Sequence, residues 1–164
     1  MQKKKEKKNE KTNVMRLLDK HNIAYTSRFY DAAEAVAGLE VAAVLGQKPE
    51  QVFKTLVTVG KSGGHYVFVI PVAQELNLKK AAEAVGEKKI EMIREKELLP
   101  LTGYVHGGCS PVGMKKVFPT VIDESSLKQP TIMVSGGRIG CQVEVDLKEL
   151  EKAVVFTTAD LCGV

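Results

Sequence analysis

The sequence predicts one α/β domain of the α+β kind, in which helices flank a mixed, largely antiparallel sheet. A chain of 164 residues is long enough to bury a single core without disulfides. Several strand-like runs follow one another with no helical stretch between them, which favours antiparallel or mixed pairing over a purely parallel sheet. No internal repeat or domain linker interrupts the pattern, so one domain is expected over residues 12–164, after a disordered basic tail at 1–11.

The expected helices carry polar residues that can cap their first turn and glycine or proline near their ends. Thr12, Asn77 and Asp146 are the expected N-caps. Gly86 is expected to end one helix, and Pro100 to limit another. The expected helical segments are 12–21, two short helices within 31–45 that separate at Gly38, and then 78–85, 94–99 and 147–152.

The expected strands are short runs of β-branched and aromatic residues bounded by turn residues. Residues 60–64 form a glycine-rich connection that predicts a hairpin between two of them. Residues 102–111 contain too much glycine and proline for a regular element. The expected extended segments are 23–30, 52–59, 66–72, 90–92, 117–122, 131–135, 141–145 and 154–157.

Charge and cysteine content exclude some functional classes and leave others open. The tail at 1–11 holds six lysines and two glutamates and therefore carries the whole net charge of +4. Lysine pairs at 79–80, 88–89 and 115–116 either cluster to hold a polyanion or are scattered and solvated. Three widely spaced cysteines without a C-x-x-C pair argue against a disulfide framework and a metal site, so neither metal nor cofactor is expected. No apolar run approaches a membrane span, and a cytoplasmic location with no membrane partner is expected.

Lys54 lies in the middle of the strand-like run Val52-Phe53-Lys54-Thr55-Leu56-Val57. Alternate side chains of a strand share a face, so Lys54 lies with Val52 and Leu56, whereas Thr55 points to the other face. A lysine between aliphatic neighbours either extends its stem along the core to water or is held at the base of a cleft to meet an anion. The run itself leaves both interpretations open.

Two glycine-rich loops could bring backbone N–H groups close to a ligand, or could simply be tight turns. One is Gly107-Gly108-Cys109-Ser110-Pro111, and the other is Ser135-Gly136-Gly137-Arg138-Ile139-Gly140. Neither matches the P-loop or the dinucleotide fingerprint. Cys109 near His106 is a conceivable nucleophile pair, but no third residue orients the histidine, and packing is the simpler role for this cysteine.

Taken together, these pieces form an ordered series: Lys11-Thr12-Asn13, Val52-Phe53-Lys54-Thr55-Leu56, Pro71-Val72, Glu75 to Ala82, Lys88-Lys89, Thr102-Gly103-Tyr104, Gly107 to Pro111, and Val134 to Gly137. The series resembles the YbaK/EbsC family of bacterial Cys-tRNA(Pro) deacylases over nearly everything after residue 11. The resemblance implies a YbaK-like fold with a sheet curled like a barrel. It also implies trans-editing, the hydrolysis of the ester that joins cysteine to a tRNA wrongly charged by prolyl-tRNA synthetase.

The resemblance also assigns residues. It implies catalytic roles for Lys54, Gly107 and Gly108, the lysine contacting the 3′-terminal nucleotide and the glycine amides lying near the scissile carbonyl. It implies substrate binding by Tyr30, Thr55, Ser110, Ser135, Gly136 and Gly137. In the family the substrate thiol attacks its own ester, so no enzymic nucleophile is expected. The expected partners are the acceptor end of mischarged tRNA and a possible prolyl-tRNA synthetase complex. Alternatives are a deacylase for another small amino acid, such as alanine, and a non-catalytic module that binds tRNA or a synthetase.

Overall fold

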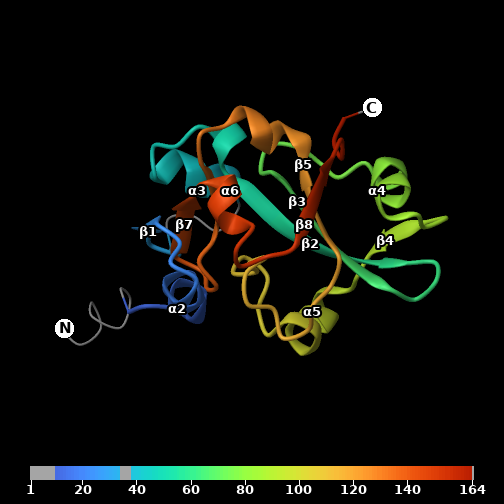
Figure 1. Cartoon of the computed structure of the whole chain (residues 1–164), viewed down its shortest axis with the longest axis horizontal. Coiled ribbons are helices and arrows are strands. Elements are labelled where there is room, and N and C mark those ends of the chain that lie inside the picture. The colour runs from blue at the N-terminus through green and yellow to red at the C-terminus, as the bar shows by residue number, and fades with distance from the viewer. Residues whose placement is uncertain (1–9, 34–37, 164) are drawn as a thin grey trace.

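The computed structural model describes residues 10–33 and 38–163. Its strands form a five-stranded sheet in the order β4-β2-β3-β5-β8 and a three-stranded sheet in the order β1-β7-β6 (Figure 1). In chain order the elements are α2 (Asn13–Lys20), β1 (Tyr25–Phe29), α3 (Gly38–Val44), the 3₁₀ helix η1 (Pro49–Gln51), β2 (Phe53–Gly60), β3 (His65–Pro71), α4 (Leu78–Val85), β4 (Ile90–Met92), α5 (Glu95–Thr102), β5 (Thr120–Asp123), the 3₁₀ helix η2 (Glu124–Lys128), β6 (Ile132–Ser135), β7 (Cys141–Val145), α6 (Leu147–Leu150) and β8 (Phe156–Ala159).

Strand pairing confirms the mixed, largely antiparallel arrangement. β2 pairs antiparallel with β3 and with β4, and β7 pairs antiparallel with β1 and β6. The pairs β3·β5 and β5·β8 are parallel. The barrel-like curl is not supported, because the described strands divide into two sheets that meet at the isolated bridge between Val52 and Met133.

The main core lies between the two sheets and α2. Val57 and Val69 of the large sheet, Val143 of the small sheet and Leu18 of α2 all belong to this apolar cluster. The other face of the large sheet packs against α4, where a second cluster includes Phe68. The large sheet is therefore buried on both faces. Figure 1 shows α2, α3 and α6 gathered around the small sheet, with α4 and β4 toward the other end of the molecule.

Helix ends follow the expected capping chemistry, with one exception. The side chains of Thr12, Asn77 and Asp146 each accept a backbone N–H from the first turn of their helix, and Gly86 ends α4 with φ of 73°. Pro100, however, lies inside α5, which continues to Thr102. The expected stop at Pro100 is wrong, because the proline ring lies exposed on the helix surface. The Thr102 hydroxyl donates to the Leu98 carbonyl and the Gly103 N–H donates to the Leu99 carbonyl, which satisfies these two carbonyls near the end of the helix.

Several expected boundaries shift. The strand expected at 117–122 begins at Thr120, leaving Val117 almost fully exposed, and the strand expected at 154–157 lies at Phe156–Ala159. Gly38 begins α3, and most of the first helix expected before it lies outside the described residues. Residues 1–9 of the expected tail also lie outside them, and Lys11 is paired with Asp19 at 2.6 Å. Among the residues that are described, no helix has the length and apolar character needed to cross a bilayer.

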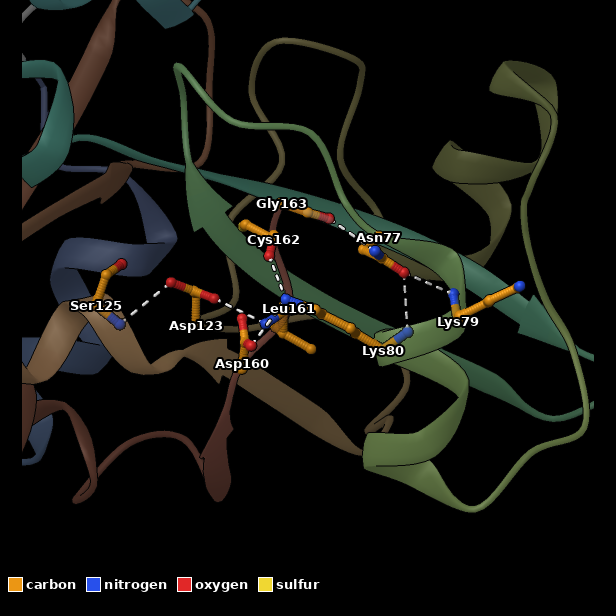
Figure 2. Close-up of polar contacts among 9 residues, drawn as sticks. All are labelled: Asn77, Lys79, Lys80, Asp123, Ser125, Asp160, Leu161, Cys162 and Gly163. Carbon is orange, nitrogen blue, oxygen red and sulfur yellow. Dashed lines mark hydrogen bonds and ion pairs between the residues drawn. The ribbon is translucent and has the colours of Figure 1, made fainter.

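The segment after β8 is fastened between β5 and the start of α4 (Figure 2). The Leu161 N–H donates to Asp123 Oδ1 at 2.9 Å, and the Asn77 N–H donates to the Leu161 carbonyl at 2.8 Å. Lys80 Nζ reaches both Asp160 Oδ2 and the Cys162 carbonyl, each at 2.8 Å. These contacts hold Leu161 in the second apolar cluster, on the face of the large sheet that also carries Leu56.

Candidate functional site

Along one edge of the large sheet, the first half of β2 has no β4 partner. This stretch is called the open edge below, and β6 approaches its start at the bridge between Val52 and Met133. β4 pairs with β2 only at Thr58, Val59 and Gly60. The Val52 carbonyl accepts the Val72 N–H, so the backbone polar groups of Val52 point toward β3. In an antiparallel ladder these groups alternate between the two sides of a strand, so the N–H and C=O groups of Phe53 and Thr55 point away from β3. This open edge, from Phe53 to Leu56, forms one wall of a cavity of about 330 Å³. That volume is at the low end of the range of about 300–1,000 Å³ for small-molecule pockets.

The cavity brings together five of the nine predicted site residues: Tyr30, Lys54, Thr55, Gly107 and Ser135. They come from four separate parts of the chain, namely the end of β1, the edge of β2, the loop after α5 and the end of β6. Lys54 is half-buried, on the opposite face of β2 from Thr55. Apolar side chains of α3 and α5, Val41 and Leu98, complete the wall. The cavity is therefore mainly apolar, with a few convergent polar groups, as ligand sites generally are.

The other four predicted residues, Gly108, Ser110, Gly136 and Gly137, do not line the cavity. The Gly108 N–H donates to the Val105 carbonyl at 2.9 Å, so it is engaged within its own loop. Ser110 is fully buried, and its hydroxyl accepts the Val112 N–H at 3.2 Å.

The glycines among these four allow close packing of neighbouring segments. A Cβ at Gly108 would lie 2.9 Å from the Arg138 Cα, and a Cβ at Gly136 would collide with Cys141 Sγ. Gly137 has φ of 99°, and its N–H donates to Ser135 Oγ at 3.1 Å. These residues shape the walls from behind, whereas Gly107 and Ser135 reach the surface of the cavity.

Cys109 and His106 both line the cavity, but their environments differ. His106 is exposed, whereas Cys109 is buried in the main core cluster. Burial raises the pKa of the Cys109 thiol to about 12, so the thiolate is strongly disfavoured at neutral pH. This supports the packing role for Cys109. Among the described residues, no group of three or more His, Cys, Asp or Glu side chains could hold a metal ion.

Gln142 is a cavity residue that the sequence did not reveal. It lies in the middle strand of the small sheet, opposite Ser135 on one side and Arg28 on the other. Polar and apolar residues alternate in the run Cys-Gln-Val-Glu-Val, which is typical of a strand with one exposed face. The pattern therefore predicts an exposed glutamine, whereas Gln142 is only 7% exposed. Its Oε1 and the Oγ1 of Thr55 are both buried without a hydrogen-bond partner among the described residues.

One member of each lysine pair has a local environment of its own. Lys80 is held by Asp160, and Lys89 pairs with Glu91 at 2.8 Å. Lys116 lines a second cavity of about 300 Å³, between α2 and the segment after α6. These contacts favour the interpretation of scattered lysines, each with a local environment of its own.

Lys54 also lies within electrostatic reach of the C-terminal segment. Burial raises the pKa of the Cys162 thiol to about 12 and Asp123 adds to the rise, while the positive charge of Lys54 opposes it. The stem of Lys54 shares its face with Val52 and Leu56, which pack in apolar clusters. Lys54 thus lines the cavity and carries a positive charge there, a combination suited to an anionic group of a ligand.

Comparisons with known proteins show which family the chain belongs to. Residues 33–153 match the family described as the aminoacyl-tRNA editing domain. A relative in Enterococcus faecalis, provisionally named Cys-tRNA(Pro)/Cys-tRNA(Cys) deacylase EbsC, is 46% identical over 142 residues, which cover 86% of this chain and 87% of the relative. A stretch of proline–tRNA ligase from Pelobacter propionicus is 32% identical over 84 residues, covering 51% of this chain but only 15% of the ligase.

The fold agrees as well. A solved structure, described provisionally as a trans-editing enzyme for prolyl-tRNA synthetase, superposes with a TM-score of 0.79 at 27% identity and covers 93% of this chain and 99% of that one. These matches confirm the resemblance that the ordered series of sequence motifs indicated. The chain belongs to the aminoacyl-tRNA editing domain family.

Proposed function

We propose that this protein is a trans-editing deacylase that cleaves the ester of Cys-tRNA(Pro) in the cytoplasm. The observation that carries the proposal is the cavity at the open edge of β2, where Lys54, Thr55, Gly107 and Ser135 converge. Membership of the editing family and the name of the 46% identical relative support the same substrate class. The cavity volume of about 330 Å³ suits a small aminoacyl group.

The need for such an enzyme follows from the limits of apolar selectivity. A synthetase pocket built for proline gains only about 1–3 kcal/mol from a methylene-sized difference, too little to reject cysteine reliably. A second site must therefore remove the wrong amino acid. The proposed partners are the acceptor end of the mischarged tRNA and prolyl-tRNA synthetase, which would supply tRNA selection.

In the proposed reaction the substrate supplies its own nucleophile. The cysteine sulfur forms a bond to the ester carbonyl carbon, the bond from that carbon to the ribose oxygen breaks, and the thiol proton passes to the departing oxygen. The resulting thiolactone is then opened by water. If release of the thiolactone is the enzymatic step, the protein is formally a lyase, with hydrolysis following in solution.

The protein's part in this reaction is placement and charge stabilisation. Lys54 would hold the anionic 3′-terminal nucleotide through its charge, and the backbone of Gly107 would face the developing oxyanion. Gly108 then supports Gly107 by packing, because its own N–H is already bonded to Val105. The high pKa of Cys109 supports a mechanism without an enzymic thiolate.

The test is deacylation of Cys-tRNA(Pro) by wild-type protein and Lys54→Ala, with Lys61→Ala as a control at an exposed lysine of the β2–β3 turn. We expect kcat/KM to fall by about 100-fold or more in Lys54→Ala, as for loss of a substrate-positioning group, and to be unchanged in the control. Wild-type turnover by Lys54→Ala would contradict the proposal.

A panel of Cys-, Ser- and Ala-tRNA(Pro) tests the chemistry separately from Lys54. The three esters differ in whether an internal thiol is present, so only the cysteine ester should be cleaved rapidly. Equal rates on the alanine ester would replace this mechanism with one for small amino acids in general. Binding of the tRNA without any cleavage, measured with and without prolyl-tRNA synthetase, would instead indicate a non-catalytic module.

A further inference from the structure

The loop after α5 presents an exposed histidine to the cavity at the tip of a tight turn. His106 and Gly107 are the two central residues of this turn, which the Gly108 N–H closes by donating to the Val105 carbonyl at 2.9 Å. Gly107 has φ of 87°, as the third residue of a type II turn requires. Both central residues line the cavity, and His106 is exposed. The turn therefore brings an accessible imidazole next to the glycine proposed to face the ester carbonyl.

The turn is held in place from behind. Gly108 packs so closely on the loop between β6 and β7 that a Cβ there would lie 2.9 Å from the Arg138 Cα. Cys109, the next residue, is buried in the main core cluster. The imidazole of His106 thus extends from a fixed base, which a group that must meet a reacting atom needs.

The proposed reaction moves one proton twice. The substrate thiol must lose its proton to become a good nucleophile, because the thiolate is the reactive form. The ribose oxygen must gain a proton as it leaves the carbonyl carbon. A side chain that accepts a proton and then donates it near neutral pH serves both steps, and imidazole is the side chain most often used in this way.

The other titratable groups at the cavity do not suit this role. Among the described residues that line the cavity, the titratable side chains are Tyr30, Lys54, His106 and Cys109. Tyrosine and lysine side chains ordinarily keep their proton at neutral pH. Burial raises the pKa of the Cys109 thiol to about 12, so this thiol keeps its proton as well. Arg138, on the loop packed against Gly108, is a permanent cation and cannot accept a proton.

We propose that His106 is a catalytic residue that carries the thiol proton to the departing ribose oxygen. This inference rests on the proposed function and adds an enzymic proton carrier to it. As the cysteine sulfur bonds to the ester carbonyl carbon, the neutral imidazole takes the thiol proton. As the bond from that carbon to the ribose oxygen breaks, the imidazolium gives the same proton to the oxygen. The ring ends unchanged, and water then opens the thiolactone.

The test is single-turnover and steady-state deacylation of Cys-tRNA(Pro) by wild type, His106→Ala and His106→Gln. Glutamine keeps a polar side chain but cannot exchange a proton near neutral pH, so both variants should lose about 100- to 10,000-fold in kcat. KM should stay within about 3-fold of wild type, since binding of the ester is not altered. His21→Gln, at an exposed histidine that ends α2, is the matched control and should keep wild-type kcat.

Added imidazole gives a readout that a structural role would not move. Because position 106 is exposed, free imidazole should reach the space left in His106→Ala and restore part of kcat, and no gain would count against proton transfer. Substitution of an exposed side chain changes stability by about 0.5 kcal/mol or less, so the melting temperature of both variants should stay within about 2 °C of wild type.

The outcomes separate the inference from the proposed function. If wild type cleaves the cysteinyl ester and His106→Gln cleaves it equally fast, the function stands and the proton carrier is overturned. A loss in His106→Ala that glutamine restores would show that His106 only places the substrate, which also overturns the inference. If wild type leaves the ester intact, the proposed function fails and the role of His106 fails with it.

Discussion

Replacing Gly108 by alanine tests how the walls of the cavity are held in place. An ideal Cβ at this position would lie 2.9 Å from the Arg138 Cα and 3.0 Å from the Arg138 carbonyl carbon and the Ile139 nitrogen. All three are backbone atoms, so no side-chain rotation can relieve the contact. The loop after α5 and the loop between β6 and β7 must therefore move apart to accept a single methyl group.

The expected cost follows from the general behaviour of overpacked sites. Forcing extra carbon into a packed region costs about 1–3 kcal/mol. For a domain of this size, each kcal/mol shifts the melting temperature by about 2–4 °C, so the midpoint should fall by about 2–12 °C. Because Gly107 and Cys109 flank the strained position and line the cavity, kcat/KM should also fall at temperatures well below the midpoint.

Gly64→Ala is the matched control. A Cβ at Gly64 would meet its nearest neighbours, Ser62 Oγ and Tyr66 Oη, at 3.4 Å, and both are side-chain atoms. Losing a glycine from the unfolded chain should make this variant neutral or more stable by up to about 1 kcal/mol. Circular dichroism melts of the two variants give the comparison. If Gly108→Ala melts within about 1 °C of wild type, the close packing of the two loops is not what requires glycine there.

Two further predictions concern single ionisable groups. Cys109→Ala should retain kcat/KM on Cys-tRNA(Pro) within about 3-fold. Burial raises the pKa of this thiol to about 12 and leaves almost no thiolate at neutral pH. Loss of turnover in a folded variant would mean that Cys109 takes part in the chemistry. Glu144→Gln should destabilise the protein by about 1 kcal/mol near pH 7. Burial acts to raise the pKa of Glu144, but hydrogen bonds from Arg28 and Thr131 outweigh burial and lower the pKa below its usual 4.5. A carboxyl group whose pKa is lower in the folded state stabilises the protein at pH values above its unfolded pKa. In denaturant melts, the difference in unfolding free energy between wild type and Glu144→Gln should therefore shrink as pH falls from about 5 toward 3. A difference that does not change with pH would contradict the lowered pKa of Glu144.

The parts of the fold that could be predicted from sequence are those fixed by neighbours along the chain. Thr12 and Asn77 bond to backbone groups two or three residues away, and Gly86 adopts a left-handed conformation for local reasons. The strand around Lys54 could be placed for the same reason, because alternation alone separates its side chain from that of Thr55. Whether Lys54 faced a cleft or open solvent depended on where β4 stops pairing, which no local pattern encodes.

The predicted loop glycines also differ in role for reasons that local sequence does not show. Glycines near a site are expected both where a backbone approaches a ligand and where two backbones approach each other, and composition cannot distinguish these cases. Gly107 lies on the cavity, whereas Gly108 lies against Arg138, about thirty positions further along the chain. Gln142 escaped prediction because burial of the small sheet's outer face depends on contacts with segments remote in sequence.

In the proposed mechanism, a site of this kind can work with few polar groups because the substrate would contribute the nucleophile. What the protein must provide is restraint, since an internal thiol reaches its own carbonyl only if the rest of the ester is held still. A single strand edge can provide this restraint, because its alternation presents Lys54 on one side and Thr55 on the other, fixed by seven paired positions along β3. The rigidity of β2 therefore sets how Lys54 and Thr55 are placed relative to each other at the cavity. On this reasoning, a substitution that leaves both side chains in place but loosens the pairing of β2 with β3 should reduce kcat more than it raises KM.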